Sequence, residues 1–212
     1  KAFPIVGIGA SAGGLEAMSE LLQALEPDLG MAYVFISHLA PDQESLLPEL
    51  LRKHTPMPVL KVENGTVVKA DHVYVIPPNA TMGIVDGVLT LKQPRSTTEK
   101  GFHPVNTFLV DLAESYQMDA VGVVLSGTAT DGTLGLKAVR AGGGWTLAQD
   151  DSAKFKDMPQ NAQEAGVVDF ILSPEGIARQ LAELRRHPVV MRKANAKPVD
   201  AGTSGLQDIL VH

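Results

Sequence analysis

The sequence predicts an α/β fold: a doubly wound, mostly parallel sheet with helices on both faces and a small antiparallel hairpin. Short β-branched and apolar runs alternate with stretches of helical period along most of the chain. That alternation is typical of parallel strands joined by crossover helices. In a central region, turn dipeptides stand between short β-prone runs instead, which indicates antiparallel strands.

The first part of the chain supplies two strands and the helix between them. Residues 3–9 and 31–36 are apolar, β-prone runs, and we expect both to be buried strands. Residues 15–25 place leucines and a methionine near helical period, so a helix is expected there. A second helix fits residues 43–53, because Pro56 follows it closely.

In the central region, the alternation of strand and helix patterns stops. Asn64-Gly65 and Asp86-Gly87 are turn dipeptides between short β-prone runs, and we expect antiparallel strands or hairpins around them. Residues 73–76 form a short strand closed by two prolines. Residues 93–101 are polar and charged, which is typical of a surface loop.

The second part of the chain returns to the alternation of strands and helices. The expected helices span residues 105–117, 132–141 and 174–184, and the expected strands span residues 120–125, 145–149 and 167–172. After these, the composition turns to Lys, Ala, Pro, Gly and Ser without any period. We therefore expect a folded domain at residues 1–187 and a linker-like tail at residues 188–212. Because the chain begins at Lys1, we expect it to be a fragment of a longer protein.

Composition excludes several classes of function. The 212 residues include 18 Lys+Arg, 24 Asp+Glu and no cysteine, for a formal net charge of −6. A disulfide scaffold, a thiolate zinc site and a cysteine nucleophile are therefore excluded. The acidic balance argues against nucleic acid, and no apolar run approaches the roughly 18 residues of a membrane span. We expect a cytoplasmic domain that uses no metal and no cofactor.

The turn after the first strand satisfies two motifs. Gly9-Ala10-Ser11-Ala12-Gly13 is a G-x-S-x-G nucleophile elbow, in which the flanking glycines expose a serine hydroxyl beside backbone N–H groups. From Gly7, the same stretch is a G-x-G-x-x-A dinucleotide fingerprint. A third interpretation is that a tight strand-to-helix crossover simply needs small residues.

The end of the second strand favours the elbow. A dinucleotide site needs an Asp or Glu there to hold the ribose hydroxyls, but this sequence has His38. An imidazole at that place can take a proton from a serine on the neighbouring turn. The alternative is an ordinary, partly exposed loop histidine. The other histidines follow no confidently predicted central strand; they are His54, His72, His103, His187 and His212.

Asp131 follows the next strong strand and completes a candidate constellation. Its carboxylate can orient a histidine and stabilise the imidazolium, or it can cap a helix, and one residue can do both. Ligands of open α/β sheets sit at the carboxyl ends of strands near a switch point. Ser11, His38 and Asp131 would all project there. Their order along the chain differs from the Ser, Asp, His order of α/β-hydrolases.

These motifs together resemble the catalytic domain of the chemotaxis receptor methylesterases, the CheB family. The similar segments, in the same order along the chain, are residues 7–17, 37–41 and 125–132 and Met158-Pro159. The resemblance runs from about Phe3 to Leu184. It implies an enzyme that hydrolyses glutamyl methyl esters on chemoreceptor helices, releases methanol and can also deamidate glutamines. The implied partners are methylated receptor helices and a fused or separate methyltransferase or phosphorylated receiver domain. Binding without catalysis is the alternative.

The resemblance also assigns roles to residues. Ser11 would be the nucleophile, His38 the general base and Asp131 the residue that orients it, with the backbone N–H groups of Ala12 and Thr128 as oxyanion donors. In the third motif the family usually has Met and Gly where this chain has Thr128 and Ala129. A backbone donor survives that replacement, but alanine cannot adopt every conformation open to glycine.

Overall fold

The computed structural model describes residues 3–37, 46–92 and 102–187. Its strands are β1 (Ile5–Ala10), β2 (Ala32–Ser37), β3 (Val59–Lys61), β4 (Thr66–Val67), β5 (Val73–Val75), β6 (Thr81–Val85), β7 (Val88–Lys92), β8 (Ala120–Val124), β9 (Trp145–Gln149) and β10 (Phe170–Leu172). A seven-stranded sheet of order β10-β9-β8-β1-β2-β5-β3 is parallel throughout. A smaller antiparallel sheet has the order β4-β7-β6. The predicted fold class is confirmed.

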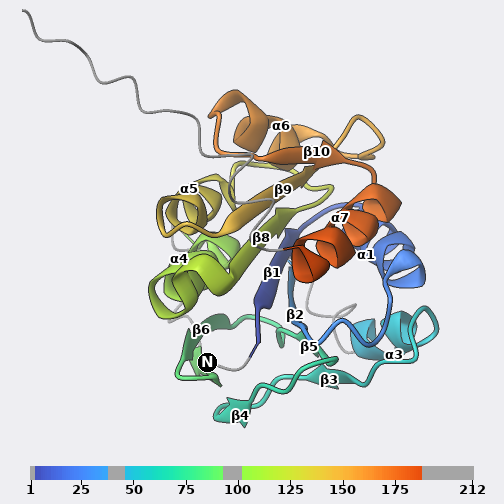
Figure 1. The fold of residues 1–212 in the computed structure, drawn as a ribbon, viewed down its shortest axis with the longest axis vertical. Helices are drawn as coiled ribbons and strands as arrows, with labels where there is room; N and C mark the ends of the chain where they lie inside the picture. Colours follow the sequence, from blue (N-terminus) through green and yellow to red (C-terminus); the bar gives the residue numbers. More distant parts are fainter. Residues whose placement is uncertain (1–2, 38–45, 93–101, 188–212) are drawn as a thin grey trace, which may run out of the picture.

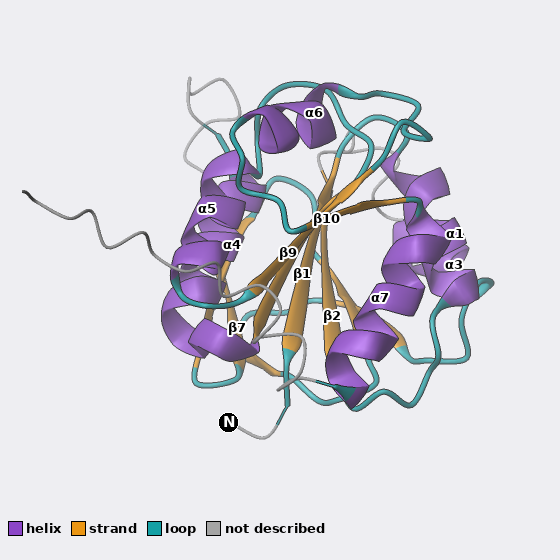
Figure 2. Cartoon of the chain, turned by 45° about the horizontal axis from the view of Figure 1, so that its top comes forward, coloured by secondary structure: helices purple, strands orange, loops and turns teal. Residues whose placement is uncertain are grey.

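Helices cover both faces of the large sheet (Figure 1). They are α1 (Gly14–Ala24), α3 (Leu47–Arg52), α4 (Pro104–Tyr116), α5 (Thr133–Ala141), α6 (Asp157–Glu164) and α7 (Pro174–Arg186), with a 3-10 turn η1 (Gln117–Asp119). Figure 2 shows α1, α3 and α7 on one side of the sheet and α4 and α5 on the other. The small sheet packs against α4, and α6 packs against α5 and β9.

The strand β1 separates two hydrophobic cores. Because successive side chains of a strand point to opposite faces, Val6 and Ile8 lie in the core beneath α1 and α7, whereas Ile5 lies in the core beneath α4. Gly7 and Gly9 face α4 at very short range. A Cβ atom on Gly7 would lie 2.7 Å from Leu109 Cδ2, so a larger residue would force the helix away from the sheet.

Two features of the chain differ from the sequence prediction. The Asn64-Gly65 turn does not form a hairpin, because β3 pairs in parallel with β5 in the large sheet whereas β4 pairs with β7 in the small one. The Asp86-Gly87 turn does join β6 and β7 in an antiparallel hairpin. Helix α6 was not predicted. It buries few residues, so its sequence shows little of the apolar period that predicts a helix. No side chain caps its N-terminus, so the usual start signal is also missing.

Several predicted segments lie wholly or partly outside the described residues. They are the first three residues of the helix expected at 43–53, the loop expected at 93–101 and the tail expected at 188–212. Within the described ranges, α3 begins at Leu47 and α7 ends at Arg186. No helix in those ranges is both long and apolar enough to cross a bilayer.

Candidate active site

The site is built at the carboxyl end of β1, where the order of strands reverses. β2 lies on one side of β1 and β8 on the other, so this end of the sheet is a topological switch point. In the β1–β2 register, Ala10 pairs with Ser37. Ser11 and His38 therefore each follow one member of that pair directly along the chain. His38 itself lies outside the described residues.

Ser11 occupies a sharp, partly exposed turn between β1 and α1. The Gly14 N–H donates to the Ser11 carbonyl at 2.9 Å, which closes the turn. Gly13 caps α1 with φ 74°, in the left-handed region that favours glycine. A Cβ atom on Gly13 would also lie 2.6 Å from Ser126 Oγ. Glycine is therefore required at position 13 both for its backbone conformation and for space.

The dinucleotide interpretation of this turn does not fit the structure. Its first two glycines, Gly7 and Gly9, lie inside β1 and not in the turn. Their lack of a side chain is explained by α4, since a Cβ atom on Gly9 would lie 2.2 Å from Val105 Cγ1. The elbow motif fits better, because it places Ser11 at the end of the strand with small residues on either side.

The segment after β8 lies against the turn that carries Ser11. A Cβ atom on Gly127 would lie 3.0 Å from Ser11 Cβ and 2.1 Å from Met158 Sδ, so only glycine fits between them. Met158 N–H also donates to the Gly127 carbonyl at 3.0 Å. In this way α6 holds the 126–128 segment beside Ser11.

Backbone donors remain available on both sides of Ser11. Within the described part of the chain, neither the Ala12 N–H nor the Thr128 N–H donates a hydrogen bond to another residue. Thr128 is exposed and Ala12 is partly exposed. Each of these N–H groups is therefore able to donate a hydrogen bond to a bound molecule.

Ala129 adopts a conformation that favours glycine. Its φ is 74°, in the left-handed region that a Cβ atom makes unfavourable. The side-chain amide of Asn161, on α6, donates to the Ala129 carbonyl at 3.1 Å. The loop therefore keeps the left-handed backbone despite the alanine, and α6 helps to hold it there.

Asp131 is buried and acts as a helix cap. Its carboxylate accepts hydrogen bonds from the Val105 N–H at 3.0 Å and from the Asn106 N–H at 2.8 Å. The capped helix is α4, rather than α5, which follows Asp131 along the chain. The capping alternative is thus confirmed, at a helix that the sequence did not suggest. A contact between Asp131 and His38 would involve a residue outside the described ranges.

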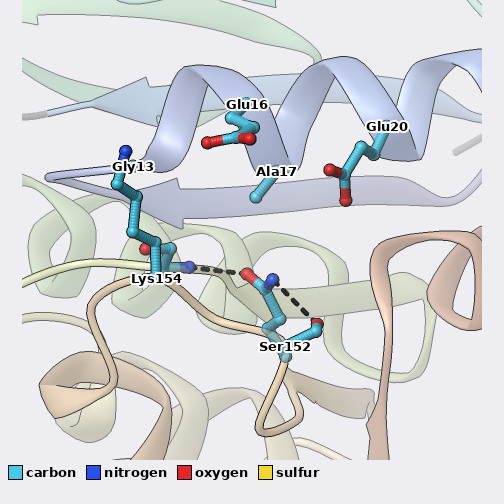
Figure 3. Close-up of a pocket in the computed structure, with 8 residues that line it drawn as sticks. Gly13, Glu16, Ala17, Glu20, Ser152 and Lys154 are labelled. Atoms are coloured by element: carbon cyan, nitrogen blue, oxygen red, sulfur yellow. Dashed lines mark hydrogen bonds between the residues drawn. The ribbon is translucent and has the colours of Figure 1, made fainter.

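A cavity of about 240 Å³ opens beside the Ser11 turn, between α1 and the loop after β9 (Figure 3). It is lined by Gly13, Glu16, Ala17, Glu20, Ser126, Gln149, Ser152 and Lys154. Burial, together with the charges of Glu175 and Glu16, raises the pKa of the Glu20 carboxyl. The cavity is polar, with two carboxylates on α1 and the Lys154 ammonium on the facing loop.

Sequence reasoning missed Gln149, which lines this cavity and is buried. Its Oε1 accepts a hydrogen bond from the Ser126 N–H at 2.9 Å, and its Nε2 donates to Ser152 Oγ at 3.2 Å. A glutamine as the last residue of a fully buried strand was the available signal. Among the described residues, no three acidic or histidine side chains gather as metal ligands would.

Comparison with known proteins gives one consistent result. A family model described as "CheB methylesterase" matches residues 6–181. The chain is 33% identical, over 184 residues, to "Protein-glutamate methylesterase/protein-glutamine glutaminase of group 3 operon" from Rhizobium meliloti (strain 1021). That match covers 86% of this chain and 52% of the relative, so the chain spans about half the length of this relative.

A larger protein and a solved structure are also similar to this chain. The chain is 37% identical, over 159 residues, to an uncharacterized 104.1 kDa protein in the hypE 3' region of Rhodobacter capsulatus, covering 74% of this chain and 16% of that protein. Among solved structures, the crystal structure of the Thermotoga maritima CheB methylesterase catalytic domain superposes with a TM-score of 0.80 at 26% identity. That alignment covers 87% of this chain and 100% of the Thermotoga chain.

Proposed function

Because the chain belongs to the CheB methylesterase family, we propose that it is the catalytic domain of a protein-glutamate methylesterase. Its substrates would be glutamyl methyl esters on chemoreceptor helices, which it would hydrolyse to glutamate and methanol. The same site would hydrolyse glutamine side chains to glutamate and ammonia. The partners would be methylated receptor helices in the cytoplasm.

The observation that carries this proposal is the placement of Ser11. Its side chain stands on a partly exposed turn at the switch point of the sheet, and the Ala12 and Thr128 N–H groups in the segments beside it bond to no other described residue. Acyl transfer needs a nucleophile and oxyanion donors in that relationship. Nucleotide binding needs an acidic residue after β2, and the sequence has His38 instead.

The residues would act in the following order. His38 accepts the proton of the Ser11 hydroxyl as Oγ attacks the ester carbonyl, and the Ala12 and Thr128 N–H groups stabilise the oxyanion. The tetrahedral intermediate collapses to an acyl-enzyme, and methanol leaves with the proton from His38. Water, activated by His38, then attacks the acyl-enzyme and releases glutamate and free Ser11. Asp131 would orient His38 while it caps α4.

The test is the substitution Ser11→Ala. We expect the loss of methanol release from methylated receptor fragments, by about 10³-fold or more in kcat. The variant should keep its fold, because Ser11 is partly exposed and its backbone makes the turn contacts. A fluorophosphonate should add covalently to Ser11 of the wild-type chain and not to the variant. Turnover retained by Ser11→Ala would refute the assignment.

A second candidate is a domain that binds receptors or a fused partner without turning over esters. The match that covers only 16% of an uncharacterized 104.1 kDa protein shows a similar domain within a much larger chain, as a fused partner would require. The same assays separate the two functions. A binding domain would leave methanol release at the background rate and Ser11 unlabelled.

A further inference from the structure

The buried residue Ser126 forms hydrogen bonds to the backbone on both sides of the Ser11 side chain. Its carbonyl accepts the Ser11 N–H at 3.0 Å. Its Oγ donates to the Ala12 carbonyl at 2.8 Å. The peptide group before Ser11 and the one after Ala12 are thus both bound to Ser126, which is only 1% exposed. Together these two bonds fix the backbone from which the Ser11 side chain projects.

The same residue ties this turn to the loop after β9. Ser126 Oγ accepts the Phe155 N–H at 3.0 Å. The Ser126 N–H donates to Gln149 Oε1 at 2.9 Å, and Gln149 Nε2 in turn donates to Ser152 Oγ (Figure 3, dashed lines). Because every polar group of Ser126 is bonded, its position is set by β9 and by the loop that lines the cavity.

From these contacts we infer that Ser126, held by Gln149, is a positioning residue for Ser11. The inference rests on the proposed function, in which Ser11 is the nucleophile. Ser126 touches no reacting atom. It acts by fixing the direction of the Ser11 side chain and of the Ala12 N–H, and a misplacement of about 1 Å at such a site costs about 10²-fold in rate.

The glycine in the turn gives the hydrogen bond from Ser126 Oγ its importance. Gly13, which follows Ala12, has no Cβ atom to restrict it and adopts φ 74°. Without the bond from Ser126 Oγ, the peptide group between Ala12 and Gly13 can rotate. A Cβ atom on Gly13 would lie 2.6 Å from Ser126 Oγ. Glycine at position 13 therefore also leaves the space in which the Ser126 hydroxyl bonds to the turn.

The central test is Ser126→Ala in the whole chain, with two readouts. We expect kcat for methanol release to fall by about 10- to 100-fold, with KM within about twofold of the wild type, because substrate binding is untouched. The rate at which a fluorophosphonate forms its covalent bond with Ser11 Oγ, losing fluoride, should fall by a similar factor. Unchanged labelling by Ser126→Ala would overturn the inference.

A matched control separates positioning from general destabilisation. Thr146 is also fully buried, on β9. Its Oγ1 lies 2.7 Å from the Val167 carbonyl and 2.9 Å from the Asp169 carboxylate, and it accepts the Asp169 N–H at 3.1 Å, all far along the chain from Ser11. Thr146→Val should lower the melting temperature at least as much as Ser126→Ala, yet leave the labelling rate of Ser11 unchanged. Equal losses of labelling in the two variants would overturn the inference.

Gln149→Met provides a second variant should Ser126→Ala fail to fold. Methionine keeps the volume of the side chain but removes the acceptor of the Ser126 N–H. We expect labelling of Ser11 to slow by about threefold to tenfold, since the bonds from Ser126 to the turn remain. Wild-type labelling by this variant would count against the inference. Labelling without hydrolysis of glutamyl esters in the wild-type chain would refute the proposed function alone.

Discussion

Asp131 and Asn106 cap each other's helices. The Asp131 carboxylate accepts the Asn106 N–H at the start of α4, at 2.8 Å. In return, the Asn106 side-chain carbonyl accepts the Gly132 and Gly135 N–H groups at the start of α5, each at 2.9 Å. Because helix N-termini leave backbone donors unsatisfied, this exchange fixes the two helices to one another. It also fixes the loop that follows β8 and runs past Ser11.

The reciprocal cap predicts a stability defect for Asn106→Ala. The substitution leaves two N–H groups at the start of α5 without their acceptor. Loss of a cap costs about 0.5–2 kcal/mol, and for a chain of this size we expect the melting temperature to fall by about 1–8 °C. Thermal unfolding followed by circular dichroism measures it. As a control, Lys137→Ala, at an exposed position on α5 away from the cap, should shift the midpoint much less.

The proposed triad predicts an order of damage among three variants. His38→Gln should lose about 10³-fold or more in kcat, because glutamine cannot take the proton of the Ser11 hydroxyl as an imidazole can. Asp131→Asn should lose less, since the imidazole remains, but should also destabilise the N-terminus of α4. His103→Gln should be silent. The three variants are compared by their rates of methanol release per folded molecule. Damage by His103→Gln with a silent His38→Gln would show that the wrong histidine was chosen.

The backbone of Ala129 predicts a stabilising substitution. Ala129→Gly removes the strain of a Cβ atom at φ 74°, about 1–2 kcal/mol. The added freedom of glycine in the unfolded chain offsets about 0.4–1 kcal/mol of this. We expect the melting temperature to rise by about 1–4 °C with activity unchanged. Ala165→Gly, on a residue with φ −70°, is the matched control and should lower stability.

The raised pKa of Glu20 predicts that Glu20→Gln changes the stability of the chain in a pH-dependent way. Burial, with the charges of Glu175 and Glu16, raises the pKa of Glu20 in the folded chain above its ordinary value, so ionised Glu20 opposes folding. Glu20→Gln should therefore raise the melting temperature slightly at pH 7. The gain should disappear as the pH falls below about 4.5, where Glu20 is protonated both folded and unfolded. Because the group is still partly exposed to solvent, about 0.5 M salt should reduce the gain. An equal gain at pH 4 and pH 7 would contradict the assignment.

The domain boundary predicts that the tail is dispensable. The closing helix α7 ends at Arg186, and Ser126, Asp131 and Gln149 all precede it. Ending the chain at His187 should leave the melting temperature and methanol release unchanged. Apart from residues 206–211, the residues after it follow no helical or strand period, so little of the tail is expected to pack on the domain. A fall of about 1 kcal/mol or more in stability, or about 2–4 °C, would show that the tail packs on the domain.

Local features of the sequence were sufficient for the fold class and for the turn that carries Ser11. The alternation of strand and helix periods depends on neighbouring residues alone, and so does the need for small residues around a sharp turn. The Asp86-Gly87 hairpin was predictable for the same reason. The Asn64-Gly65 turn has similar chemistry, yet its two strands enter different sheets. Turn residues specify a bend in the chain but not which strand each arm will pair with.

The supports of the candidate site depended on the tertiary structure. Asp131 accepts the N–H of Val105, 26 residues earlier at the start of α4, and Gln149 holds Ser126 across a separation of 23 residues. No period or motif in the sequence links such pairs, because they meet only when β8, β9 and α4 pack together. Ser11 as a candidate nucleophile was determined by the sequence itself. Which residues hold its backbone in place was decided by the packing of distant elements, because buried polar groups must find their partners wherever the fold brings them.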